Sequence, residues 1–140
     1  MLLDTHVWIW AATADGRLGR KTRRRLDRMM RTASGDRLFV STASILEIAA
    51  LHTAGRLQFD RPVERWINES LYAAHLRVLD LTRTIALDAG LVPAAALADP
   101  IDRCLVATAR EHDLPLVTCD RRILEYAKRT GLVRTVDGSS

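Results

Sequence analysis

A short segment near the end of the chain reads Leu-Val-Thr-Cys-Asp at residues 116–120, and the chain begins Met-Leu-Leu-Asp at residues 1–4. Both are apolar runs that end on an acid. Neither shows the alternation of apolar and polar residues that is typical of a strand with one face in water. Such runs are typical of parallel strands covered on both faces. Further short strands are expected at 38–40 and 78–79, and a last one at 132–136.

Helical patterns separate these strands. We expect helices at about 5–13, 19–32, 43–54, 62–75, 82–90, 99–112 and 121–130, from capping residues before them and glycines after them, and a loop at 34–36. This order predicts an α/β fold, a three-layer α/β/α sandwich with a short central parallel sheet. We expect one domain over residues 1–136 and a flexible tail over 137–140.

The composition is that of a globular protein with a basic charge. The chain has 140 residues, 48% hydrophobic residues and a net charge of +4, and all its basic residues except Lys21 and Lys128 are arginine. Arginine suits phosphate and base contacts, but codon bias in a GC-rich genome would produce the same excess. We find no membrane span, secretory signal or disulfide framework, which favours a cytoplasmic protein.

Two acids follow predicted strands directly. Asp4 ends the first strand, and Asp120 follows the strand at 115–118. Ligands of open parallel sheets bind outside the carboxyl ends of the strands. If the two strands are neighbours, both carboxylates therefore meet at one edge of the sheet, although Asp120 could also be only the cap of the next helix.

Glu47 lies in an apolar helix. Its neighbours at helical spacing are Ala43, Ser44, Ala50 and Leu51, and none of them can pair with a carboxylate. An ionised carboxylate in apolar surroundings is costly unless a cation compensates it. Glu47 therefore needs an arginine or a bound cation from elsewhere, or a place at the water-facing edge of its helix.

Asp99 and Asp102 stand in the first turn of one predicted helix, with Pro100 between them. Asp99 suits the N-cap, and an acid in a first turn is stabilised by free amides and the helix dipole. Capping is enough to explain Asp99. Asp102 is more ambiguous, because the residues that follow it make the start of the helix apolar.

The four carboxylates of Asp4, Glu47, Asp102 and Asp120 are thus expected at one edge of the sheet. Gathered carboxylates repel one another and require a divalent cation. Hard oxygen ligands without histidine or thiolate favour Mg²⁺, with Mn²⁺ as a substitute, over Zn²⁺. A metal held in this way usually acts on a substrate that carries phosphate.

The segments around these acids resemble PIN-domain ribonucleases, in particular the VapC-type toxins of bacterial toxin–antitoxin pairs. The matching segments occur in the family's order at 2–7, 44–49 with 55–57, 99–103 and 116–120. Two positions depart from the resemblance: Cys119 stands where relatives often carry a basic residue, and Leu97-Ala98 where they often have His-Arg. Both changes could alter substrate contacts.

The resemblance implies a metal-dependent endoribonuclease that hydrolyses RNA phosphodiester bonds. By this resemblance, the family's four acidic site residues correspond to Asp4, Glu47, Asp102 and Asp120, and Asp99 is a further candidate ligand. The family's hydroxyl residue corresponds to Thr118. One or two Mg²⁺ ions would be held there. The protein would be the toxin of a toxin–antitoxin pair, a cytoplasmic homodimer that a cognate antitoxin silences.

An antitoxin could insert a basic side chain among the carboxylates of this cleft. We expect the rim of the cleft to carry Arg103, Arg121 and Arg122. A separate basic cluster spans residues 17–31, which could bind RNA phosphates, dock an acidic antitoxin segment or simply face water. The histidines lack ligand spacing and are interpreted as structural, and Trp8 and Trp10 as core or dimer residues.

Two other functions are compatible with the sequence. The chain could be a catalytically silent PIN-fold module that binds RNA or a partner, although such a module would not need four repelling carboxylates. It could also be a phosphatase-like hydrolase. That chemistry commonly uses two aspartates separated by one residue at the first strand, and here His6 stands where the second would be.

Overall fold

The computed structural model describes residues 1–32 and 37–140, so the loop expected at 34–36 lies outside the described residues. The strands are β1 (Leu2–Leu3), β2 (Phe39–Ser41), β3 (Arg77–Leu79), β4 (Leu116–Thr118) and β5 (Thr135–Asp137). The helices are α1 (Thr5–Ala12), α2 (Arg20–Arg31), α3 (Thr42–Thr53), α4 (Val63–Ala73), α5 (Arg83–Leu91), α6 (Pro100–Glu111) and α7 (Arg121–Thr130). The alternation of strands and helices expected from the sequence is confirmed.

The strands form one parallel sheet in the order β3-β2-β1-β4-β5. Successive side chains of a strand point to opposite faces. Leu3 and Val117 accordingly pack into one core with α1, α2 and α4, whereas Leu2 and Leu116 pack into a second core with α6 and α7. Both faces of β1 and β4 are buried, which explains why these two strands lack polar alternation.

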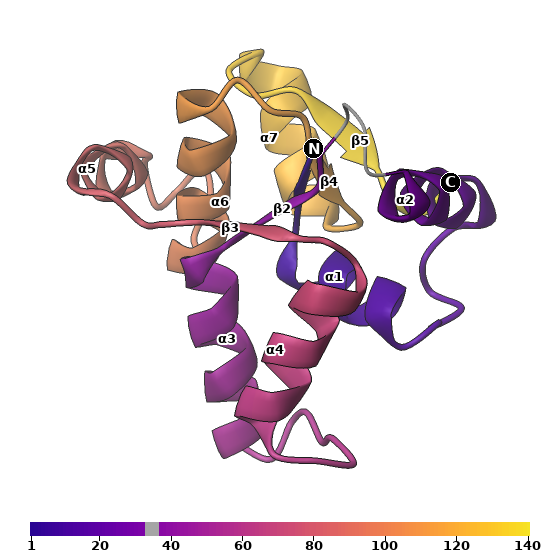
Figure 1. The fold of residues 1–140 in the computed structure, drawn as a ribbon. Coiled ribbons are helices and arrows are strands. Elements are labelled where there is room, and N and C mark those ends of the chain that lie inside the picture. The colour runs from indigo at the N-terminus through magenta and orange to yellow at the C-terminus, as the bar shows by residue number, and fades with distance from the viewer. Residues whose placement is uncertain (33–36) are drawn as a thin grey trace.

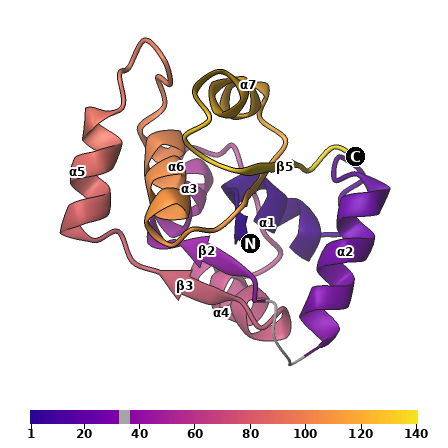
Figure 2. The same cartoon turned by 90° about the horizontal axis from the view of Figure 1, so that it is seen from above.

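Figures 1 and 2 show the resulting layers, with α1 and α2 on one side of the sheet and α6 and α7 on the other. Helix α5 packs on α6 through Ile85 and Ala89, outside the layer next to the sheet. Helices α3 and α4 extend together beyond the sheet (Figure 1). No helix of the described residues has the length and apolar character that a membrane crossing requires.

The last residues differ from the expected flexible tail. Asp137 is part of β5, and the amide of Gly138 donates to the carbonyl of Thr118 at 2.8 Å. The amides of Gly19 and Thr22 donate to the carbonyls of Gly138 and Ser140, so the chain end lies against the start of α2 (Figures 1 and 2). These hydrogen bonds satisfy amides at the start of α2 that have no partner within the helix.

Candidate active site

Asp4 occupies the junction between β1 and α1. One carboxylate oxygen caps α1 by accepting the amide of His6 at 3.3 Å, and the other accepts the hydroxyl of Thr118 at 2.5 Å. Only 6% of Asp4 is exposed. Burial raises the pKa of Asp4 above its ordinary value, while the Thr118 hydroxyl opposes this shift. The Asp4 carboxylate is therefore held in place, but its hydrogen bonds only partly offset the cost of burying its negative charge.

Asp120 stands at the equivalent junction between β4 and α7. It caps α7 through the amide of Arg122 at 2.8 Å, and both its oxygens accept hydrogen bonds from the Arg122 guanidinium. These bonds lower the pKa of Asp120. The amide of Asp120 in turn donates to the Thr118 hydroxyl at 3.0 Å. Because β1 and β4 are paired, Thr118 links the two acids and fixes their relative position.

Asp102 contributes the least compensated charge. It lies in the first turn of α6, where Asp99 caps the helix by accepting the amides of Ile101 and Asp102. Asp102 is 8% exposed, and among the described residues no hydrogen bond reaches its carboxylate. Burial, followed by the charge of Asp99, raises the pKa of Asp102 to about 7. A nearby cation would restore its ionised form at neutral pH.

Glu47 enters from the second turn of α3 and is half-buried. Burial raises its pKa, and the neighbouring Thr5 hydroxyl partly offsets this effect. Within the described part of the chain, no arginine forms an ion pair with Glu47. An arginine partner is therefore ruled out within the described residues, whereas a bound cation and contact with water both remain compatible with a half-buried Glu47.

One cavity of about 350 Å³ is lined by the four acids, here called the acidic cleft. Its other lining residues are Asp99, His6, Trp10, Arg17, Cys119 and Arg122. Thr118 is fully buried behind Asp4. Burial raises the pKa of the Cys119 thiol to about 11, so Cys119 is an uncharged wall residue. The structure thus gathers every predicted metal ligand around one cavity.

The rim of the acidic cleft differs in part from the expectation. Arg122 lines it, but the side chain of Arg103 turns to the carbonyl of Val92, and Arg121 is not a lining residue. Conversely, three residues that the sequence interpretation did not place at this site also line the cleft. They are His6, interpreted as structural, Trp10, interpreted as a core or dimer residue, and Arg17, assigned to the basic cluster at 17–31. One sequence signal was available, because His6 and Trp10 are four residues apart on one helix and so share a face with each other.

The donor chemistry of the acidic cleft, carboxylate oxygens without a thiolate, fits a hydrated divalent cation. Among residues 1–32 and 37–140, no three acidic, histidine or cysteine side chains are arranged to hold an ion by protein atoms alone. Mg²⁺ commonly keeps several waters and binds only one or two carboxylates directly, so a closed cage is not needed. The raised pKa values of Asp4, Glu47 and Asp102 mark negative charge that the protein itself leaves uncompensated.

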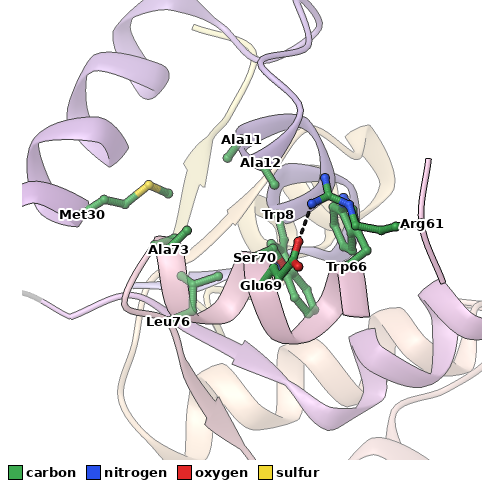
Figure 3. A pocket seen from close by; sticks show the side chains of 11 residues that line it. Trp8, Ala11, Ala12, Met30, Arg61, Trp66, Glu69, Ser70, Ala73 and Leu76 are labelled. Carbon is green, nitrogen blue, oxygen red and sulfur yellow. Dashed lines mark hydrogen bonds and ion pairs between the residues drawn. The ribbon is translucent and has the colours of Figure 1, made fainter. Parts of the chain in front are cut away.

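A second cavity of about 400 Å³ lies apart from the acidic cleft and shares no lining residue with it. Figure 3 shows its lining, with Trp8 and Trp66 toward one end and Met30 and Leu76 toward the other. The Arg61–Glu69 ion pair stands at its side. Trp8 and Trp10 thus face different cavities, as their spacing on one helix predicts. This second cavity has no titratable cluster suited to hydrolysis.

Comparison with known proteins agrees with this architecture. Residues 1–129 match the PIN domain family, and the chain belongs to that family. It is 34% identical over 126 residues to Ribonuclease VapC22 of Mycobacterium tuberculosis (strain ATCC 25618 / H37Rv), and this match covers 90% of the chain and 91% of the relative.

Solved structures share the fold at low sequence identity. VapBC2 from Rickettsia felis, bound to a DNA fragment from the promoter, contains a chain with a TM-score of 0.67 and 12% identity, covering 96% of both chains. FitAcB from Neisseria gonorrhoeae contains one with a TM-score of 0.61 and 19% identity, covering 96% of this chain and 94% of that one. The α/β class predicted from the sequence is confirmed.

Proposed function

We propose that this chain is a metal-dependent endoribonuclease that hydrolyses RNA phosphodiester bonds and acts as the toxin of a toxin–antitoxin pair. The observation that carries the proposal is the gathering of Asp4, Glu47, Asp102 and Asp120 around one cavity at the carboxyl ends of β1 and β4. The identity to a protein named as a ribonuclease supports RNA as the substrate.

Asp4, Asp102 and Asp120 would hold Mg²⁺ or Mn²⁺, and Glu47 would hold a metal or orient the attacking water. A bound ion would supply a water of lowered pKa and neutralise charge on the phosphoryl oxygens. Thr118 is a positioning residue, because its hydroxyl joins the Asp4 carboxylate to the Asp120 amide. Arg122 keeps Asp120 ionised and stands where it can also meet a phosphate.

The proposal includes two protein partners and a cytoplasmic location. A toxin–antitoxin complex from Klebsiella pneumoniae contains a chain of the same fold, with a TM-score of 0.61, which supports a cognate antitoxin for this chain. The exposed side chains of Leu87 and Leu91, one helical turn apart on α5, offer an apolar surface for a homodimer. The acidic cleft, with three poorly compensated carboxylates, is suited to accept a basic side chain of the antitoxin.

The test is cleavage of a panel of structured RNAs by the purified chain. We expect cleavage with Mg²⁺ or Mn²⁺ and none with excess chelator, with activity returning when the metal is added back. Asp102→Asn should be inactive under every condition, which controls for a contaminating nuclease. Cleavage that persists in excess chelator contradicts the metal mechanism, and the absence of cleavage by folded protein with either metal contradicts the activity.

A further inference from the structure

One wall of the acidic cleft is built from flat groups rather than acids. The Trp10 ring contacts two other groups: the His6 ring centroid is 5.8 Å away, and the guanidinium carbon of Arg17 lies 4.8 Å over the Trp10 ring. All three line the cavity that holds the carboxylates. Trp10 also packs against the buried core, so this wall is attached to the rigid body of the fold.

Arg17 is held in place although it lies at the surface. Its Nε and Nη2 atoms donate to the two oxygens of Asp15 at 3.1 and 2.8 Å, and its own amide donates to the same carboxylate. The guanidinium of Arg23 ties this loop down by donating to the carbonyls of Trp10 and Asp15. The Arg17 side chain is nevertheless 68% exposed, so its outer face is free to meet a ligand.

An exposed ion pair of this kind contributes little to folding, so stability does not explain the arrangement. Long-range attraction of phosphate does not explain it either, because Asp15 offsets the charge of Arg17 and the Arg17 hydrogen bonds lower the pKa of Asp15 to about 2. What the arrangement supplies is an oriented planar surface. Guanidinium planes and aromatic rings are the surfaces on which proteins stack single-stranded RNA bases.

We propose that Arg17, backed by Trp10 and oriented by Asp15, stacks on the base of an RNA nucleotide next to the bond that is cut. The inference rests on the proposed ribonuclease function and adds a determinant of substrate choice to it. The platform and the carboxylates line the same cavity, so an RNA strand with its scissile phosphate in this cavity can lay a flanking base on Arg17. Purines, with the larger stacking surface, should be favoured at that position.

The reference variant is Arg17→Ala, which removes both the guanidinium plane and its charge. Three further variants separate stacking from charge. Arg17→Lys keeps the charge and removes the plane. Asp15→Asn keeps one oxygen for the Arg17 amide but removes the acceptor of Nη2, and it makes the region more positive. Arg134→Ala is the matched control, because Arg134 is an exposed arginine paired with an exposed aspartate, Asp113, away from the acidic cleft. Thermal melting should show that all three fold as the wild type does.

The first measurement is cleavage kinetics on an RNA that the wild type cuts, with single abasic nucleotides placed in turn on either side of the cut. Arg17→Ala should raise KM about tenfold with little change in kcat, as expected for a lost base stack. Arg17→Lys should not restore KM. At one flanking position, the abasic substitution should raise the KM of the wild type by a similar factor. The same substitution should leave the KM of Arg17→Ala unchanged, because that variant has already lost the stacking contact.

The second measurement is binding, which does not depend on cleavage. Fluorescein-labelled adenosine and uridine RNA dodecamers are titrated with protein in Ca²⁺ and followed by anisotropy. The wild type should prefer adenosine, Arg17→Ala should lose the preference, Asp15→Asn should weaken binding, and Arg134→Ala should match the wild type. Normal kinetics in Arg17→Lys, or tighter binding in Asp15→Asn, overturns stacking in favour of a charge contact. Unchanged binding and kinetics in Arg17→Ala overturn the inference, whereas a wild type that binds RNA without cutting it overturns only the proposed ribonuclease activity.

Discussion

Asp4, Asp99 and Asp120 each cap a helix and each line the acidic cleft. Capping and metal binding are therefore not alternatives for these residues. A carboxylate has two oxygens and about four lone-pair directions, so accepting one or two amides leaves room for a further ligand. Asp102 is different, because its carboxylate receives no hydrogen bond from the described residues.

Asp102→Asn should abolish cleavage and raise the thermal stability of the metal-free protein. The substitution removes a buried, repelled charge while keeping the size of the side chain. At pH 8 we expect a gain of about 1–2 kcal/mol, a few degrees in Tm, after allowing for partial access of solvent. Asp4→Asn and Asp120→Asn should also abolish cleavage, with smaller stability changes because Thr118 and Arg122 already bond to these acids.

Asp113→Asn is the control for these variants. Asp113 is an exposed aspartate paired with Arg134, and asparagine tolerates its positive φ of 50°. It should retain full cleavage. If the three cleft variants unfold in the absence of metal while Asp113→Asn stays folded, the cleft acids are structural caps rather than metal ligands.

The metal-free protein should lose stability as the pH rises from about 4 to 7. Asp102 has a folded pKa of about 7 against an ordinary value of 3.8. Between these values the folded state holds more protons than the unfolded state, so the free energy of unfolding falls with increasing pH. The raised pKa values of Asp4 and Glu47 act in the same direction.

Differential scanning calorimetry in chelator, at intervals from pH 4.5 to 8, measures this dependence. Asp102→Asn should make the slope shallower, and saturating Mg²⁺ should remove it in the wild type by stabilising the ionised carboxylates. A stability that rises with pH over this window in chelator contradicts the assignment of Asp102 as an uncompensated buried acid.

At the level of the element, the start of α6 carries both a cap and a candidate ligand. Asp99→Asn should keep cleavage and stability near wild type, because asparagine caps about as well as aspartate. It should also lower the pKa of Asp102 by removing the adjacent charge. Asp99→Ala should cost about 1 kcal/mol through the lost cap. Chemical denaturation and cleavage rates should be measured for both Asp99 variants. Loss of cleavage in a folded Asp99→Asn protein would place Asp99 in the metal site.

At the level of the whole molecule, an antitoxin could inhibit the protein in two ways. It could occupy the acidic cleft, or it could bind the separate cavity lined by Trp8 and Trp66. If the antitoxin inserts a basic side chain among the carboxylates, its binding should block cleavage and slow hydrogen exchange at the caps around Asp4 and Asp120. The measurement is hydrogen exchange by mass spectrometry on the complex with the protein encoded by the neighbouring gene. Protection confined to α4 and the cavity of Figure 3, with cleavage still blocked, rules out direct occupation of the acidic cleft.

The elements themselves were determined locally. Short apolar runs specify buried strands, and Thr82 and Asp99 each cap a helix at the residue where the pattern predicted a start. These signals depend on residues a few positions apart, which is why one sequence suffices to find them. The placement of Asp4 and Asp120 followed from the parallel sheet, because acids after neighbouring strands necessarily share an edge.

Other features depend on side chains from distant parts of the chain. Sequence spacing could not show that Arg17 lies over Trp10, that Arg103 turns away from the acidic cleft, or that the last residues lie against α2. It could not show the raised pKa of Asp102 either, since burial and neighbouring charges exist only once α6 is packed. The sequence by itself determined the strands, the caps and the acids at the strand ends. Only the tertiary structure decided which of those acids are compensated and which side chains face them, because both depend on distances that folding alone creates.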